Sequence, residues 1–117
     1  KKEVEDQSIV DTALREACEE LLIDLKTITP IGILKPIDTV EYKFEVYPVV
    51  CLISDKPSSF NKSEVQDLYY VPIEELKKEK NWVFRGHYDS DWVFDIDGEV
   101  LWGATAKMVR NLLNITH

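Results

Sequence analysis

The sequence Arg15-Glu16-Ala17-Cys18-Glu19-Glu20-Leu21-Leu22-Ile23 carries three carboxylates at spacings of three and one. On a helix, residues three and four positions apart share a face, so Glu16, Glu19 and Glu20 are expected to project together. Like charges on one face repel, and a cation between them would relieve the repulsion. Hard divalent cations such as Mg²⁺ prefer oxygen ligands of this kind. A solvated acidic helix face is the simpler interpretation of these residues alone.

The residues around this stretch predict an amphipathic helix. Ser8 followed by Asp11 resembles a helix-capping pair, and apolar residues then recur at helical spacing. The expected buried stripe comprises Val10, Ala13, Leu14, Ala17 and Leu21. The helix is expected to run to about Leu22. A glycine would close it in the left-handed conformation, which is costly for leucine, so a different ending around Asp24 is expected.

The order of residues around the carboxylates resembles the Nudix box. The pattern of that family is a Gly, five residues, a Glu, seven residues, and then Arg-Glu-aliphatic-x-Glu-Glu-x-Gly-aliphatic. The positions that match in register are Arg15-Glu16, Ala17, Glu19-Glu20 and Ile23. Three positions depart from the pattern. Lys1 stands at the opening Gly, Gln7 at the first Glu and Leu22 at the late Gly.

Three later segments resemble the coenzyme A branch of the Nudix hydrolases. They are Tyr47-Pro48-Val49-Val50, then Glu64-Val65 with Leu68-Tyr69-Tyr70-Val71-Pro72, and finally Leu101-Trp102-Gly103-Ala104-Thr105-Ala106. Their family counterparts are Val-x-Pro-Val-Val, Glu-Val with Val-Pro-Leu, and Ile-Trp-Gly-Leu-Thr-Ala, in the same order. The resemblance implies an enzyme that hydrolyses the diphosphate of coenzyme A or acyl-coenzyme A. The implied products are 3′,5′-ADP and a phosphopantetheine species.

The resemblance also implies a role for each of five residues, with Mg²⁺ or Mn²⁺ as the cofactor. Glu16 and Glu20 would bind the metal, and Glu19 would be a third ligand or act through water. Glu64 matches the late Glu of the family and would complete the site or serve as general base. Arg15 would orient the carboxylates through a charge-assisted hydrogen bond. The expected catalytic residues are therefore Glu19, Glu64 and Arg15, and the expected metal ligands Glu16, Glu19 and Glu20.

Three functions stay open at this point. The retained carboxylates favour an active diphosphate hydrolase of the coenzyme A type. Gln7, Leu22 and the absent opening glycine favour a Nudix fold kept as a binding domain with weak or no activity. The third alternative is a Nudix hydrolase of another diphosphate, such as ADP-ribose or a nucleoside triphosphate.

The pattern of the whole chain predicts an α/β fold. Strands are expected over residues 27–34, 42–53 and 64–71, a short helix from Pro72, a hairpin from Trp82-Val83-Phe84 and Trp92-Val93-Phe94, a turn at Asp97-Gly98 and a helix over residues 103–114. The class expected is a Nudix-type α/β/α sandwich with a mixed central sheet that lacks its N-terminal strands. The 117 residues suit one domain, here a single and partial Nudix domain over 1–117.

Composition limits the partners. A net charge of −8 argues against nucleic-acid backbone as a ligand, and no apolar run is long enough to cross a bilayer. The expected partner is a nucleotide-containing small molecule, while a homo-oligomer or a segment before Lys1 is left open. Cys18 and Cys51 lack metal-site spacing and predict free thiols in a reducing, intracellular compartment. Cytoplasm, mitochondrion and peroxisome are not distinguished.

Overall fold

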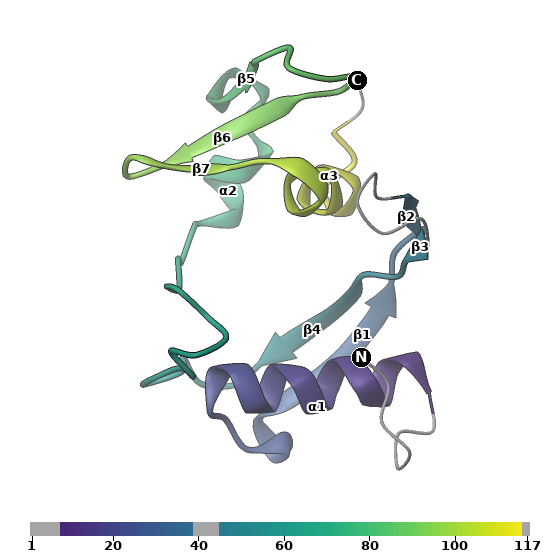
Figure 1. Ribbon diagram of the computed structural model, residues 1–117, viewed down its shortest axis with the longest axis vertical. Coiled ribbons are helices and arrows are strands. Elements are labelled where there is room, and N and C mark those ends of the chain that lie inside the picture. The colour runs from purple at the N-terminus through teal and green to yellow at the C-terminus, as the bar shows by residue number, and fades with distance from the viewer. Residues whose placement is uncertain (1–7, 39–44, 116–117) are drawn as a thin grey trace. The chain divides into compact units, whose positions relative to one another are not determined.

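The computed structural model describes residues 8–38 and 45–115 (Figure 1). The chain divides into two compact units. The first unit comprises Lys1–Lys35 and Tyr47–Leu68, and the second comprises Pro36–Val46 and Tyr69–His117. Each unit has its own helices and its own antiparallel strand pairs.

The main helix of the first unit is α1, Ile9–Leu21, which carries most of the acidic stretch. Its start is as predicted, because the Ser8 Oγ accepts a hydrogen bond of 3.1 Å from the backbone N–H of Asp11. The expected apolar stripe faces inward only in part. All five of its side chains are half-buried, and none of the residues of α1 is fully buried.

The end of α1 differs from the prediction. Leu22 takes the left-handed conformation, with φ 52° and ψ 47°, and its backbone N–H donates to the carbonyl of Cys18. The predicted ending around Asp24 is therefore wrong. Leu22 adopts the conformation that a glycine would take, although its side chain is 57% exposed. Since this conformation costs a residue with a Cβ about 1–2 kcal/mol, Leu22 is a strained position.

A two-stranded sheet lies beside α1 in the first unit (Figure 1). Strand β1, Ile28–Ile33, pairs antiparallel with β4, Val49–Ile53. The register shifts between Pro30 and Gly32, so this strand is irregular. Within the described residues β4 pairs with β1 alone. Residues 42–44 of the predicted strand over 42–53 lie outside the described residues.

The strand predicted over residues 64–71 is also wrong, because Glu64 lies in a turn and residues 65–71 form neither helix nor strand. Val65, Leu68, Tyr69, Tyr70 and Val71 have the side chains that strands favour. A strand needs a neighbour for its backbone groups, and these residues pair with no described strand.

The second unit holds the other elements. These are β2 (Ile37–Asp38), β3 (Glu45–Val46), α2 (Ile73–Lys77), β5 (Trp82–Phe84), β6 (Trp92–Ile96), β7 (Glu99–Leu101) and α3 (Gly103–Leu112). The predicted hairpin is confirmed, with Trp82 opposite Phe94 in the β5–β6 pair. Asp97 and Gly98, both with positive φ, make the predicted turn between β6 and β7.

The hydrophobic core of the second unit is built from Trp82, Phe94, Ala106 and Ile115. Of the apolar residues on α3, Ala106 is 2% exposed, whereas Leu112 is 45% exposed. Arg110 takes part in the burial instead. Its guanidinium lies 4.8 Å from the ring centre of Trp82 and 4.9 Å from that of Trp92. Burial lowers the pKa of Arg110, and the two aromatic faces stabilise the charge of its guanidinium.

Helices combined with antiparallel sheets confirm the mixed α/β class. In the described residues the strands form three sheets of two, two and three strands rather than one mixed central sheet. No described helix is both long enough and apolar enough to cross a bilayer.

Candidate functional site

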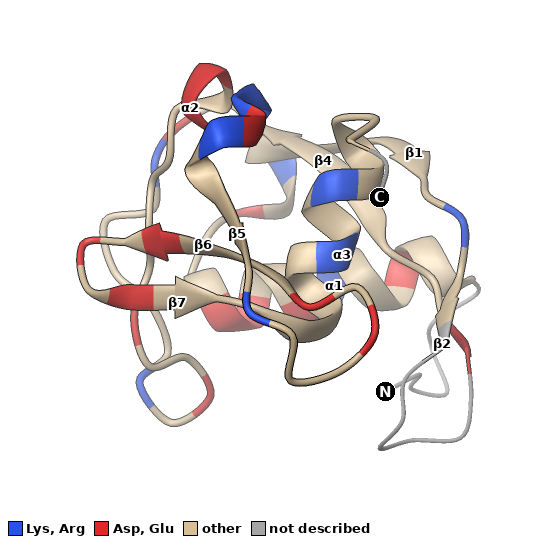
Figure 2. Ribbon diagram, turned by 90° about the horizontal axis from the view of Figure 1, so that it is seen from above, with Lys and Arg blue, Asp and Glu red and all other residues tan. Residues whose placement is uncertain are grey.

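Helix α1 presents acidic side chains along much of its length (Figure 2). Arg15 and Glu19, one turn apart, form an ion pair in which Nη1 lies 3.1 Å from Oε1 and 3.3 Å from Oε2. Arg15 was expected to orient the carboxylates, and the carboxylate that it contacts here is that of Glu19. The first Glu of the family box falls on Gln7, which lies outside the described residues. Glu16 and Glu20 have the same spacing of four residues, but both side chains are acidic, so their charges repel.

The electrostatics of Glu20 show which carboxylates approach one another. The pKa of Glu20 is raised, first by partial burial and then by the negative charges of Glu16, Glu64 and Glu19. Glu64 is far from Glu20 in the sequence, so the fold alone brings its charge within range. The charges of the other three glutamates of the predicted site, Glu16, Glu19 and Glu64, therefore all act on Glu20.

Glu64 reaches α1 through a turn that is attached to the end of the helix. The backbone N–H of Asn61 donates to the carbonyl of Glu20 at 2.8 Å. That carbonyl belongs to the last turn of α1, where the helix itself supplies no donor. The carbonyl of Asn61 then accepts from the N–H groups of Glu64 at 3.1 Å and Val65 at 2.8 Å. Asn61 thus connects the helix to the turn that carries Glu64.

The donor set suits a hard divalent cation in chemistry and charge. It consists of carboxylate oxygens, and the raised pKa of Glu20 shows a repulsion that a bound cation would relieve. The described residues do not, however, include three Asp, Glu, His or Cys side chains close enough together to form a completed metal site. The carboxylates are near enough for their charges to raise the pKa of Glu20, but among the described residues they do not lie close enough together to hold one ion jointly.

The sequence analysis did not identify Asn61 as part of this site. It lies in the segment Asn61-Lys62-Ser63, which indicates only a loop by composition. The sequence carries no sign of this role, because the role of Asn61 depends on a backbone hydrogen bond with Glu20. Such a contact leaves no pattern in the residue types.

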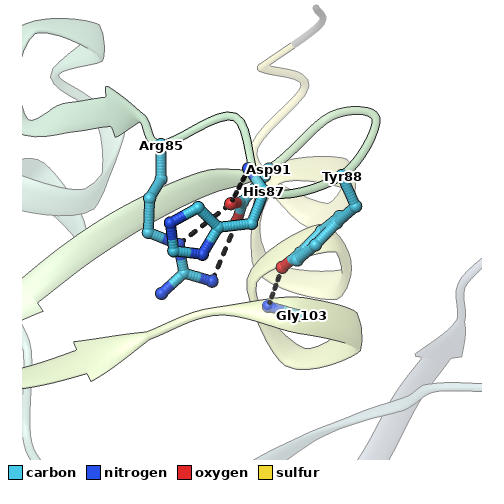
Figure 3. A network of polar contacts seen from close by, with 5 residues as sticks. All are labelled: Arg85, His87, Tyr88, Asp91 and Gly103. Atoms are coloured by element: carbon cyan, nitrogen blue, oxygen red, sulfur yellow. Dashed lines mark hydrogen bonds and ion pairs between the residues drawn. The ribbon is translucent and has the colours of Figure 1, made fainter.

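A second polar cluster lies in the connection between β5 and β6 of the second unit (Figure 3). Its central residue, Asp91, is 0% exposed. Arg85 donates to its carboxylate through Nε at 2.9 Å and Nη2 at 3.2 Å, and the backbone N–H of His87 donates at 2.9 Å. The hydroxyl of Tyr88 accepts from the N–H of Gly103 at 3.0 Å. The cluster therefore ties the β5–β6 connection to the first residue of α3.

The pKa of Asp91 reflects this arrangement. Hydrogen bonds from Arg85 lower it to about 2, against the opposing effect of burial, and the His87 N–H and the Tyr88 hydroxyl lower it further. Every charge in this cluster has an opposite charge or a donor facing it. Such a satisfied network stabilises a loop and leaves little capacity for a ligand.

The three tryptophans are divided between packing and exposure. Trp82 and Trp92 contact Arg110 in the interior of the second unit, as expected for packing residues. Trp102, which lies in the segment that resembles the coenzyme A branch, is 56% exposed. Together with Tyr69 it lines a shallow cavity of about 260 Å³ in the second unit. Trp102 is therefore the most exposed of the three, although the Arg85 guanidinium lies 5.7 Å from the centre of its ring.

Helices with antiparallel sheets, and carboxylates gathered at the end of α1, are consistent with a Nudix-type fold. No protein-family model matches the chain. Three curated bacterial proteins similar to it are each named uncharacterized Nudix hydrolase NudL. The protein of Pectobacterium atrosepticum is 32% identical over 92% of this chain, that of Yersinia enterocolitica 30% over 96%, and that of Cronobacter sakazakii 33% over 92%.

The chain spans 58% to 60% of the length of these relatives. The similarity extends over nearly the whole chain and includes the acidic stretch of α1. It supports the Nudix superfamily as the family of this chain. Members of that superfamily generally use divalent metal ions, in agreement with the donor set on α1.

Proposed function

We propose that the protein is a divalent-metal-dependent hydrolase of a diphosphate linkage in a nucleotide-containing small molecule. The observation that supports the proposal is the hydrogen bond from the Asn61 N–H to the Glu20 carbonyl, which joins the turn that carries Glu64 to the end of the helix that carries Glu16 and Glu20. The names of the similar bacterial proteins support a Nudix-type hydrolase. The three later segments that resemble the coenzyme A branch favour coenzyme A or acyl-coenzyme A as the substrate.

The proposed reaction uses the carboxylates in separate roles. Glu16 and Glu20 would hold Mg²⁺ or Mn²⁺, which when bound neutralises phosphate oxygens and lowers the pKa of water. Glu64 completes the ligand set or accepts the proton of the attacking water. The oxygen of that water bonds to phosphorus as the bridging P–O bond breaks, which gives 3′,5′-ADP and a phosphopantetheine species from coenzyme A.

Arg15 and Glu19 have a supporting role in this proposal. Their ion pair fixes Glu19 on the neighbouring strip of the helix, where it can contact the site through water.

The experiment compares hydrolysis of coenzyme A, ADP-ribose and a nucleoside triphosphate by the intact protein with Mg²⁺, with Mn²⁺ and with a chelator. Coenzyme A is expected to turn over only with metal. Glu20→Gln is expected to lower kcat/KM about 100-fold or more. The matched control is Glu74→Gln, an equally conservative change on α2 in the second unit, where the side chain of Glu74 is 83% exposed.

The possible outcomes test the substrate, the enzyme activity and the assigned site separately. Turnover of ADP-ribose or the triphosphate without coenzyme A would keep the hydrolase and remove the coenzyme A assignment. No turnover of any substrate, together with no shift of the melting temperature by Mg²⁺, would overturn the enzyme itself. Equal losses in Glu20→Gln and Glu74→Gln would remove the assigned site.

A Nudix-fold binding domain with weak or no activity is the second candidate. Two observations favour it: the strained Leu22 in place of the family glycine, and carboxylates that do not form a completed metal site in the described residues. This candidate requires that the intact protein binds a nucleotide-containing ligand without hydrolysing it. Calorimetric titration with coenzyme A beside the turnover assay distinguishes the two.

A further inference from the structure

The exposed ring of Trp102 is held in place by the polar cluster of the second unit. Trp102 is 56% exposed, and the Arg85 guanidinium lies 5.7 Å from the centre of its ring. Arg85 is fixed in turn by the fully buried Asp91, which accepts from Nε at 2.9 Å and from Nη2 at 3.2 Å (Figure 3). An exposed side chain usually changes rotamer freely, so this contact restricts a ring that buries little of itself.

The backbone beside Trp102 is held as well. The N–H of Gly103 donates to the Tyr88 hydroxyl at 3.0 Å, and Gly103 has a φ of 65°, which a residue with a Cβ rarely adopts. The Trp102 carbonyl accepts from the N–H of Ala106 at 3.3 Å in the first turn of α3. Backbone and ring are therefore ordered in advance, which reduces the loss of side-chain freedom that binding a ligand would require.

Trp102 lines the cavity of about 260 Å³ in the second unit. A second aromatic residue of the lining, Tyr69, is 45% exposed, and the half-buried Ile96 and Leu101 add apolar surface. Exposed aromatic rings beside apolar surface favour a flat, aromatic ligand. The volume lies below the roughly 300–1,000 Å³ of sites that enclose a drug-sized molecule, so the cavity suits one ring system and not a whole nucleotide coenzyme.

The charge of the lining narrows the choice of ligand. Glu99 is the only charged side chain among the described residues that line the cavity. A carboxylate accepts hydrogen bonds and repels phosphate, so Glu99 favours a ring with N–H donors and disfavours a phosphate group in the cavity. A purine with an amino group meets both conditions, because its ring stacks on an aromatic side chain and its amino group donates.

We propose that this cavity binds an amino-bearing purine ring, stacked on Trp102 with its amino group donating to Glu99. In coenzyme A this ring is adenine, and the choice of a nucleobase over other aromatic groups rests on the proposed function. No metal ion and no step of hydrolysis enters the inference. Trp102 and Glu99 are binding residues here, whereas Arg85 is a positioning residue that acts through the ring of Trp102.

The test titrates the intact protein with adenosine and, separately, with purine riboside, which lacks the amino group. Nuclear magnetic resonance follows the indole N–H of Trp102 and the backbone N–H groups of Val100 and Thr105, without metal. Adenosine is expected to shift these signals, and purine riboside to bind about 5-fold more weakly. Trp102→Ala is expected to weaken adenosine binding about 10-fold, and Trp102→Phe, which keeps a ring, by less.

Further variants test the other residues of the lining. Glu99→Ala removes the acceptor, so adenosine and purine riboside are expected to bind it equally. Tyr69→Ala is expected to weaken adenosine binding severalfold. The matched control is Tyr70→Ala, at a neighbouring tyrosine that is 53% exposed and lies outside the described lining, and no change is expected there. Melting temperatures show that each variant is folded, and Trp102→Phe provides a conservative change at the stacking position.

Several results would overturn the inference. They are the absence of any shift at the solubility limit of adenosine, and equal adenosine affinity in the wild type and Trp102→Ala. Signals that change with protein concentration but not with nucleoside would also overturn it, since a second copy would then cover the cavity. Equal affinity of the wild type for the two nucleosides would remove the role of Glu99.

The two proposals fail separately. Turnover of coenzyme A without adenosine binding at Trp102 would remove the nucleobase site and leave the hydrolase. Adenosine binding at Trp102 without turnover of any substrate would remove the hydrolase and leave the nucleobase site. Adenosine is uncharged and is added without metal, so its binding does not depend on the acidic residues of α1.

Discussion

Glu20 in the first unit and Asp91 in the second are both carboxylates in partly or wholly buried surroundings, yet their pKa values move in opposite directions. The pKa of Glu20 is raised by burial and by three other glutamates. The pKa of Asp91 is lowered to about 2 because Arg85, the His87 N–H and the Tyr88 hydroxyl face it. The difference teaches that burial alone does not mark a site. Unrelieved repulsion marks the place where a ligand of opposite charge would be stabilised.

The two units also differ in how many hydrophobic side chains they bury. The second unit encloses a core of Trp82, Phe94, Ala106 and Ile115. In the first unit the only fully buried hydrophobic residue among those described is Ile28. The acidic residues of α1 thus lie on a helix without a fully buried residue, whereas the satisfied network of Asp91 lies in the unit that has a packed core.

The largest expected effect comes from removing the centre of that core. Trp82→Ala deletes a side chain that is 4% exposed, contacts Phe94 and Arg110, and donates from Nε1 to the Leu76 carbonyl at 2.8 Å. The free energy of unfolding, measured with denaturant, is expected to fall by about 3–5 kcal/mol. Trp102→Ala, at an exposed tryptophan, should cost less than about 1 kcal/mol. Similar losses in both would remove the contrast in packing.

Glu20→Gln tests the contrast in charge, because it should affect activity and stability in opposite directions. The proposed activity is expected to drop about 100-fold or more. In the metal-free protein the change removes one repelling charge and should raise the free energy of unfolding by about 0.2–0.5 kcal/mol. Glu19→Gln instead removes the ion pair with Arg15 and should not stabilise. Destabilisation of the metal-free protein by Glu20→Gln would contradict the repulsive site.

Asp91→Asn should convert the satisfied network into an incomplete one. It leaves Arg85 without its carboxylate, so the melting temperature at pH 7 is expected to fall by several degrees. The folded-state pKa of Asp91 is lowered, so its stabilisation is present above the ordinary pKa of 3.8 and is lost as the pH falls toward 2. The difference in melting temperature between wild type and Asp91→Asn should therefore shrink between pH 5 and about pH 2. A constant difference would argue against the ion pair.

The smallest effect is expected at the end of α1. Leu22→Gly relieves the left-handed strain next to the site and should raise the free energy of unfolding by about 1 kcal/mol. Leu22→Ala keeps a Cβ in the same conformation and serves as the control, without that gain. Equal stability of the two variants would show that Leu22 is not strained.

Much of the local structure was predictable from the sequence. The start of α1, the β5–β6 hairpin, the turn at Asp97-Gly98 and most of α3 were predicted within a residue or two. Each depends on neighbours in the chain: a capping side chain, helical or alternating spacing, or a residue pair that favours positive φ. The acidic residues of α1 share a face for the same reason, so one half of the candidate site follows from helical geometry.

The other half required the tertiary structure. Glu64 was expected on a strand and lies in a turn, because strand-forming side chains do not make a strand without a pairing partner. The contacts of Asn61 with Glu20, of Asp91 with Arg85 and of Arg110 with Trp82 also depend on how the chain folds. The sequence by itself determined which carboxylates could share a helix face and what cation they suit. Only the tertiary structure decided that Asn61 attaches Glu64 to α1, because a contact between residues far apart in the chain leaves no periodic pattern in the sequence. It also decided that Arg85 neutralises Asp91, because the path of the loop between them follows no regular spacing.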